Sequence, residues 1–256
     1  MYSPHLLLSL INNDLRSRWS GTALSWIWAF LQPLAQIALF ATVFGNLMAN
    51  RSAAFASPGY YVVYLCCGLF LWSGFSEAIA RGAASLKEKS GLLRGRSLFM
   101  AFIPLASVGS AWIVAIVGIV MALAITPFAG VDPRWTWTLI PLPILAMALM
   151  SSGLALGLAP IQALIKDTAN LLQLILQLCF WLTPVVYDPS ILPAWAQEVV
   201  RLNPIAVAVI SMHKIVLDGI LPSFSEMAVL ACGILVSQLA GWWCIRKLED
   251  EVRDAL

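Results

Sequence analysis

The sequence predicts an all-α integral membrane protein with six transmembrane helices, an N-terminal interfacial amphipathic helix, and a re-entrant helical pair before the last span. Six long apolar runs, separated by short polar stretches, are the first observation behind this fold class. Each run approaches or exceeds the roughly 18 to 20 residues that a helix needs to cross a bilayer core. The runs are 24–48, 60–80, 102–128, 136–160, 169–187 and 227–245.

Composition is the second observation. Hydrophobic residues make up 61% of the 256 residues and charged residues 11%, and the mean hydropathy is +0.86. Soluble domains carry about 25% charged residues. We therefore treat residues 1–256 as a single transmembrane domain. The net charge of +2 is too small to indicate a nucleic-acid partner.

The distribution of basic residues is the third observation. Four of the fifteen follow the odd-numbered runs, namely Arg51, Arg134, Arg201 and Lys214. The other eleven lie near the two termini or follow the second and fourth runs. Because basic residues stay on the cytoplasmic side of a membrane, we expect both termini to be cytoplasmic.

Residues 5–20 precede the first run and favour an amphipathic helix in the cytoplasmic interface. Its apolar side is weakened by Asp14 and Arg18, which are spaced for an ion pair with each other. The alternative is a frayed soluble segment.

The energy source lies outside this chain if the chain is a transporter. The sequence has no phosphate-binding loop of the form G-x-x-x-x-G-K-[ST], so we expect no ATP hydrolysis here. Only one ionisable residue, Glu77, lies within the six runs. This weakens the case for a proton-coupled carrier, which places charges near mid-membrane.

Two cytoplasmic segments are candidate docking surfaces. The loop 81–96 carries Leu86, Leu92 and Leu93 among polar residues and could present an apolar knob to a partner. A basic loop facing lipid headgroups is the alternative. The turn that contains Lys166 and Asp167 could dock in the same way.

The region 190–216 predicts the re-entrant pair. Prolines at 184, 189, 193 and 204 break or kink helices, yet the stretch after Pro204 is again apolar and too short to span. We expect it to enter the outer leaflet and turn back, as segments that form gates or pore linings do. A purely interfacial helix pair is the alternative.

Aromatic residues and glycines complete the local signals. Trp26, Trp28, Phe180 and Trp181 are candidates for lining a passage for sugars, with an interfacial aromatic belt as the alternative. The spacing of Gly153 and Gly157 permits a close helix approach, within one subunit more often than between two. The two histidines stand far apart, and five cysteines without ligand spacing predict no metal site.

Several motifs together resemble the permease subunits of ATP-binding-cassette polysaccharide exporters of the O-antigen, teichoic acid and capsule type. They cover nearly the whole chain in order and comprise 16–34, 43–45, 85–93, 166–167, 182–187, 191–195 and 202–205. The chain departs from the pattern at Phe99-Met100, where Phe-Pro is common, and at Ile165-Lys166-Asp167, where an aromatic-Arg-Asp turn is usual.

The resemblance implies a homodimer that binds two copies of a separate ATPase, with a channel at the dimer interface lined mainly by the first and fifth spans. Channel-lining residues would be Trp26, Trp28, Phe30, Phe180, Trp181 and Tyr187. ATPase-coupling residues would be Leu86, Lys87, Leu92, Leu93, Arg94, Lys166 and Asp167. The gate would include Pro193, Trp195, Asn203 and Pro204.

The functional expectation is a non-enzymatic, multi-pass subunit of the cell inner (plasma) membrane that exports lipid-linked polysaccharide, O-antigen in the first place. ATP and Mg would be bound by the partner subunit, and this chain would carry no cofactor. Export of teichoic acid, capsular polysaccharide or a smaller lipid or drug is the alternative within transport. An intramembrane enzyme acting on polyprenyl lipids is the alternative outside it; Asp132, Asp188 and Glu198 are scattered and predict no acidic cluster for it.

Overall fold

Helices form nearly all of the chain that the structure describes. The computed structural model describes residues 4–18, 25–48, 58–92 and 99–255, and no strand occurs among them. The longer helices are α1 (Pro4–Arg18), α2 (Ser25–Met48), α3 (Pro58–Glu88), α4 (Phe102–Ala124), α5 (Pro141–Leu164), α6 (Thr168–Leu182), α7 (Ala194–Leu202), α8 (Pro204–His213), α9 (Phe224–Lys247) and α10 (Glu249–Ala255). Short helical turns are η1 (Ser90–Leu92), η2 (Thr126–Ala129), η3 (Trp135–Leu139), η4 (Pro189–Ile191) and η5 (Lys214–Asp218). The all-α prediction is confirmed over these residues.

Four helical stretches among the described residues are long and apolar enough to cross a membrane. They are Gly59–Glu88, Phe102–Ala124, Trp135–Leu164 and Phe224–Lys247. The bent pair Ala194–Leu202 and Pro204–Asp218 would be a fifth if it counts as one broken span. Two shorter apolar helices, Ile27–Val43 and Thr168–Leu182, coincide with the first and fifth predicted runs. Six spans therefore remain a prediction.

Two helix ends differ from the apolar runs. Helix α3 continues to Glu88, whereas the second apolar run ends at residue 80. The stretch after Arg81 is largely polar, but the side chain of Leu86 within it is completely buried, which stabilises the additional helical turns. Helix α6 ends at Leu182, five residues before the end of the run, with Thr183 in an extended conformation. A proline at position 184 disfavours a helical conformation for Thr183. At 1.5 Å per residue, the 15 residues of α6 extend only about 22 Å.

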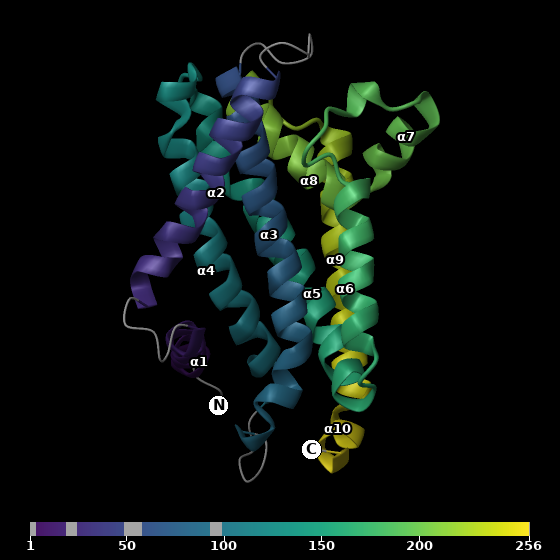
Figure 1. Ribbon diagram of the computed structural model, residues 1–256. Helices are drawn as coiled ribbons and strands as arrows, with labels where there is room; N and C mark the ends of the chain where they lie inside the picture. The colour runs from purple at the N-terminus through teal and green to yellow at the C-terminus, as the bar shows by residue number, and fades with distance from the viewer. Residues whose placement is uncertain (1–3, 19–24, 49–57, 93–98, 256) are drawn as a thin grey trace.

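Helix α3 is the centre of the bundle. It packs against α4 and α5, and α5 packs in turn against α9 (Figure 1). Leu65, Leu71, Phe75 and Ile79 of α3 are among its fully buried side chains. The indole N–H of Trp112 in α4 donates a 2.9 Å hydrogen bond to the hydroxyl of Ser151, which ties α4 to α5 in the core.

Helices α5 and α9 touch through their backbones. A Cβ added to Gly153 would lie 2.4 Å from the carbonyl carbon of Ser237, and one added to Gly241 would lie 2.0 Å from the carbonyl oxygen of Gly153. A Cβ added to Gly157 would lie 3.4 Å from the Cα atom of Gly241, which is an ordinary van der Waals contact. The small residues at 153 and 157 thus pack within one subunit, the arrangement favoured from the sequence.

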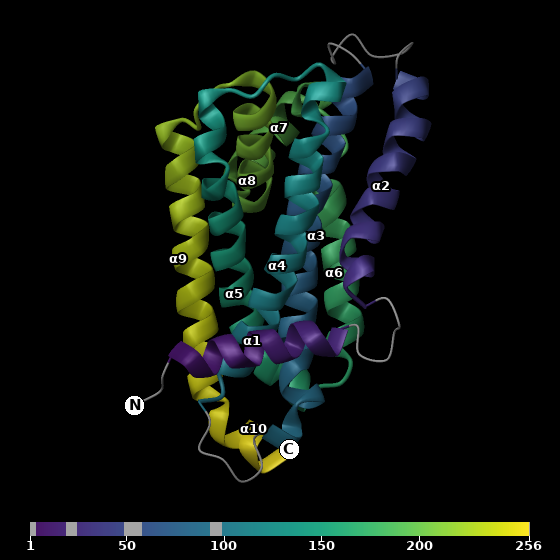
Figure 2. The ribbon, with the colours of Figure 1, turned by 90° about the vertical axis from the view of Figure 1, so that its left-hand side faces the viewer.

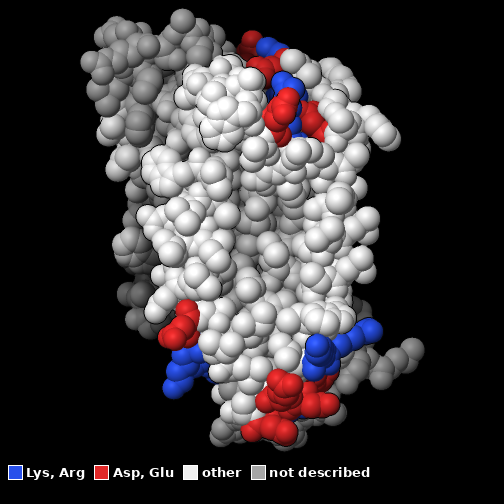
Figure 3. All heavy atoms as spheres, turned by 90° about the vertical axis from the view of Figure 1, so that its right-hand side faces the viewer, with Lys and Arg blue, Asp and Glu red and all other residues white. Residues whose placement is uncertain are grey.

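Helix α1 lies across one end of the bundle, roughly perpendicular to the long helices, and contacts α4 (Figure 2). Helices α7 and α8 lie at the opposite end (Figure 1). On the face drawn in Figure 3, charged side chains occur only near the two ends, and the broad band between them carries none. This is the charge pattern expected of a surface that contacts lipid in its middle.

Candidate functional site

Helices α2 and α6 lie on either side of α3 on one face of the bundle (Figure 1). Two cavities beside α3, which we together call the polar furrow, separate α3 from these two helices. A cavity of about 370 Å³ between α2, α3 and α4 is lined by Gln32, Gln36, Ser73 and Glu77, among others. A second cavity of about 360 Å³ is lined by α3 and α6. Ser73 and Glu77 line both cavities, so the polar side of α3 is shared between the two.

Helix α2 buries an apolar side and leaves a pair of amides exposed. Ala29, Pro33 and Ile37 are buried, whereas Gln32 and Gln36 are exposed one helical turn apart. Both glutamines line the cavity against α3. Sequence reasoning missed them, although their four-residue spacing inside an apolar run was the available signal.

Helix α6 carries a longer row of the same kind. Asn170, Gln173 and Gln177 are exposed and lead along one side of the helix to Trp181, and Gln173 lines the cavity against α3. An uncharged amide that faces hydrocarbon without a hydrogen-bond partner costs several kcal/mol. The row therefore requires water, a ligand or another protein surface beside it.

Most of the predicted channel-lining aromatics lie on the two helices that flank α3, but those whose side chains the structure describes line neither cavity of the furrow. On α2, Trp28 is 47% and Phe30 is 53% exposed, and the side chain of Trp26 lies outside the described residues. On α6, Trp181 is 61% exposed, whereas Phe180 is partly buried with its ring 5.8 Å from the Trp72 ring. Their role as a lining stays a prediction.

The segment that follows α6 is fastened to α3. The hydroxyl of Tyr64 donates hydrogen bonds to the carbonyls of Pro184 (3.1 Å) and Tyr187 (2.7 Å). Tyr61 donates likewise to Val186 at 3.0 Å. The hydroxyl of Tyr187 donates to the carbonyl of Trp181 at 3.1 Å. These bonds hold the predicted lining residues Trp181 and Tyr187 close together.

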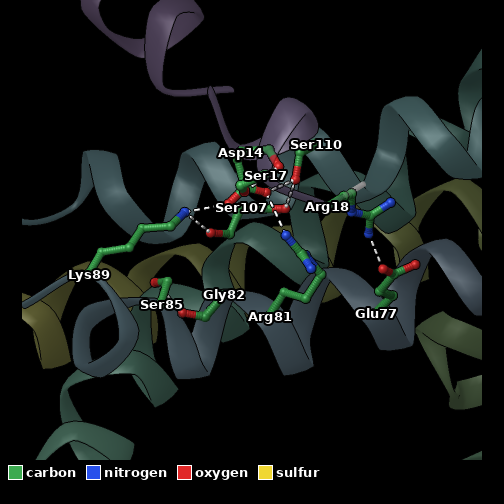
Figure 4. Close-up of polar contacts among 10 residues, drawn as sticks. All are labelled: Asp14, Ser17, Arg18, Glu77, Arg81, Gly82, Ser85, Lys89, Ser107 and Ser110. Atoms are coloured by element: carbon green, nitrogen blue, oxygen red, sulfur yellow. Dashed lines mark hydrogen bonds and ion pairs between the residues drawn. The ribbon is translucent and has the colours of Figure 1, made fainter. Parts of the chain in front are cut away.

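Helix α1 is docked by a buried charge cluster (Figure 4). The carboxylate of Asp14 is only 3% exposed and accepts hydrogen bonds from Arg81 of α3 (2.7 Å), from Lys89 directly after α3, and from Ser110 of α4. Arg18 forms an ion pair with Glu77 of α3. Burial raises the pKa of Asp14, but the bonds from Lys89, Ser110 and Arg81 outweigh it, so the pKa lies below its usual value.

This cluster corrects the interpretation of Asp14 and Arg18 as a pair that weakens the helix. Each finds its charge partner on α3 rather than on α1. Arg81 likewise pairs with Asp14 and not with Glu77, its neighbour on the same helix. Sequence spacing alone favours i,i+4 partners and could not indicate these contacts.

The coupling candidates lie at the end of the bundle that α1 crosses. Lys87 is exposed there, and so are Lys166 and Asp167 in the turn between α5 and α6. Leu86 differs from the expectation of a surface knob, because it is fully buried beside Met100 and Leu156. The side chain of Leu92 and the whole of Leu93 and Arg94 lie outside the described residues.

The gate candidates form a sharply bent helix pair at the other end. Helices α7 and α8 meet at 95°, and the side chain of Asn203 caps α8 by accepting a 3.0 Å bond from the N–H of Ile205. Pro204 begins α8 and packs against Gly233 of α9. Pro193 precedes α7, and Trp195 within it is 72% exposed. A bent pair fits a re-entrant segment or a broken span, and its function as a gate stays a prediction.

Comparisons with known proteins identify the family of this chain. Residues 5–217 match the family model described as ABC-2 type transporter. An O-antigen export system permease protein, RfbA, of Myxococcus xanthus is 24% identical over 98% of this chain and 95% of its own length. A protein of the same name from Klebsiella pneumoniae is 23% identical, over 100% and 96%. The polysialic acid transport protein KpsM of Escherichia coli is 19% identical, over 94% and 93%. This chain belongs to the membrane subunits of the ABC-2 type transporter family.

Proposed function

We propose that this chain is the permease subunit of an ATP-driven exporter that moves lipid-linked polysaccharide, O-antigen in the first place, across the inner membrane. Relatives that align over nearly their whole length are named O-antigen export permeases. A relative named for the transport of polysialic acid, KpsM, shows that other polysaccharides occur among the named substrates of relatives. Teichoic acid, capsular polysaccharide or a smaller lipid or drug is the second candidate cargo.

The polar furrow is the single observation that carries the proposal. It combines exposed amides on α2 and α6 with a serine and glutamate side of α3. A hydrophilic polymer needs such a wet path, whereas lipid next to these groups would leave them unsatisfied. Exposed aromatic rings elsewhere on α2 and α6, such as Trp28 and Trp181, would supply apolar area for the C–H faces of sugars without a fixed charge that would trap them.

One copy of the chain provides only an open furrow, so the proposal includes a homodimer. A second copy, placed with its own α2 and α6 against the first, would convert two furrows into a closed conduit. Some of the exposed apolar side chains on α2 and α6, such as Leu34 and Leu178, would then contact the second copy, and the others would contact lipid.

The motor would be two copies of a separate ATPase that bind ATP and Mg. The exposed Lys87, Lys166 and Asp167 lie at the end that α1 crosses, and this end would face the cytoplasm together with both termini, as expected from the distribution of basic residues. Helix α1 would lie in the membrane interface at this end, and α7 with α8 would form the gate at the other. Coupling would pass through α3, since α3 carries Lys87 and the partners of Asp14 and Arg18.

Replacement of the α6 amides tests the proposal. In cells that lack the chromosomal gene, the double variant Gln173→Leu and Gln177→Leu should reach the membrane normally, because leucine is favourable against lipid. Surface polysaccharide should fall severalfold while lipid-linked polymer accumulates inside. The matched variant with Gln→Asn at both positions keeps the amides and should export far better. Normal surface polysaccharide in the leucine variant, or in the deletion strain itself, would contradict the proposal.

An intramembrane enzyme is the candidate from another class. It requires a cluster of acids or histidines that holds metal and diphosphate. Within the part of the chain that the structure describes, no three His, Cys, Asp or Glu residues are grouped for a metal. No observation favours this candidate over transport.

A further inference from the structure

A separate polar pocket lies at the end of the molecule where α7 and α8 meet. It has a volume of about 440 Å³, within the usual range for small-molecule sites. Its walls come from α3 (Tyr64), the segment after α6 (Asp188), α7 (Arg201) and η5 (Lys214). None of the residues that line the two furrow cavities lines this pocket.

One wall of the pocket is a rigid aromatic surface. The Tyr64 ring stacks on the His213 ring with 3.7 Å between their centroids, and the Nε2 atom of His213 lies 3.0 Å from the carbonyl oxygen of Tyr64. His213 is only 5% exposed. Because the Tyr64 hydroxyl is also bonded to the segment after α6, the ring is held on two sides. Tyr64 is itself only 4% exposed, so it supports the pocket from behind, whereas the half-buried Tyr60, which also lines the pocket, can offer an apolar ring face at little entropic cost.

The remaining walls carry planar hydrogen-bonding groups. Asp218 accepts a 2.7 Å bond from the hydroxyl of Tyr60, and Asp188 accepts a 2.8 Å bond from the N–H of Ser190. Gln197 donates from its amide nitrogen to the carbonyl of Leu192 at 2.9 Å. Each contact occupies only part of the capacity of the side chain, since a carboxylate offers about four acceptor sites and an amide oxygen two. The groups are thus positioned and still able to bind a ligand.

The charges in the pocket nearly cancel. Its lining includes three carboxylates, Asp188, Asp218 and Glu226, and two cations, Arg201 and Lys214, of which Lys214 forms an ion pair with Glu226. A net charge near −1 disfavours a phosphate or another compact anion. An uncharged molecule with many hydroxyl groups can instead use donors and acceptors of both kinds.

We propose that this pocket is a second carbohydrate site, which holds one or two sugar units of the polymer beyond the furrow. Tyr60 would contact the C–H face of a sugar ring, while Arg201, Gln197 and Asp188 would bond its hydroxyls. The location is consistent with a site further along the path of the polymer, because Asp188 in the pocket directly follows Tyr187, whose hydroxyl donates to the carbonyl of Trp181 near the end of α6. The identity of the ligand as exported polymer rests on the proposed function.

Direct binding tests the site. The full chain, purified in nanodiscs with any subunits that accompany it, is titrated by calorimetry with oligosaccharides of one to three repeat units. These are cut from the surface polysaccharide of the source cells and freed of lipid. We expect saturable binding that Arg201→Met weakens about tenfold, since a charge-assisted hydrogen bond is lost. Glu198→Met is the matched control, because Glu198 is an exposed charged residue on the same short helix that does not line the pocket; it should bind as the wild type does.

Three outcomes would overturn the site. They are no saturable binding to the wild type, equal binding by the two methionine variants, and inorganic phosphate binding in place of the oligosaccharide. Failure of the proposed function is separate, because it appears in cells as unchanged surface polysaccharide in the deletion strain. If the chain exports polymer but the titration shows no binding, only the proposal of a second carbohydrate site is refuted.

Discussion

Asp14 of α1 and Arg81 of α3 form a 2.7 Å ion pair in which the carboxylate is almost completely buried. Lys89 and Ser110 complete the shell around this carboxylate, so a helix at the end of the bundle is fastened to both α3 and α4 (Figure 4). Arg81 and Lys89 keep a quarter to a third of their side chains exposed, which lowers the desolvation cost of the cluster. These contacts should cause α1 and α3 to move together.

Removal of the buried carboxylate should loosen α1. Asp14→Ala leaves Arg81, Lys89 and Ser110 without their shared acceptor, and we expect a loss of about 2 kcal/mol in the free energy of unfolding. A lower melting temperature of the detergent-solubilised protein and faster proteolysis near residue 20 would report it. Asn13→Ala is the control, because Asn13 is exposed on the same helix. Equal melting of the two variants would contradict a structural role for the cluster.

The same carboxylate should make the docking of α1 sensitive to acid. Burial acts to raise the pKa of Asp14, yet the bonds from Lys89, Ser110 and Arg81 leave that pKa below the usual value. A depressed folded-state pKa means that its stabilisation is fully present above about pH 3.9 and is lost as the pH falls through the folded-state pKa. Proteolysis of α1 should therefore be constant from pH 7 to about 5 and increase below 4. In Asp14→Asn this increase should be smaller, and an identical profile would exclude Asp14 as the group responsible.

The close contact of α5 and α9 predicts very different effects for two glycines on one helix. Gly153→Ala places a methyl group against the backbone of Ser237, which cannot yield without separating the helices, and should cost about 1–3 kcal/mol. The methyl group that Gly157→Ala adds would lie 3.4 Å from the Cα atom of Gly241, an ordinary contact, so this substitution should be tolerated. Expression level and thermal stability in detergent measure both. Similar stability of the two variants would mean that the helices do not approach so closely.

Substitutions of two neighbouring aromatic residues on α6 should differ in their effects on thermal stability and on export. Phe180 packs on Trp72, so Phe180→Ala should lower thermal stability as well as export. Trp181 is largely exposed, so Trp181→Ala should keep the melting temperature and slow export severalfold. Export is measured as the amount of surface polysaccharide in complemented cells. Unchanged export in Trp181→Ala would return this residue to the interfacial aromatic belt.

Part of the candidate site could be predicted from the sequence because it depends on local properties. Aromatic residues in apolar runs predict rings at a membrane surface or passage, and Trp28 and Trp181 are exposed, although their role as a lining stays a prediction. The apolar stretch after Pro204 predicts a new helical segment, and α8 begins at Pro204. The glutamines on α2 and α6 were overlooked, since a single amide in an apolar run is unremarkable until its neighbours on other helices are known. Only the packing of α2 and α6 beside α3 groups these amides along one furrow.

The sequence by itself determined that the chain is helical, apolar over most of its length and broken by proline after position 183, because hydrophobicity and backbone restriction act within a few residues. The tertiary structure decided which charges pair and which surfaces remain open. Asp14 meets Arg81 across 67 positions of sequence, and Leu86 leaves the surface because distant helices cover it. Such contacts depend on how helices pack in three dimensions, and no periodicity along a single helix encodes them.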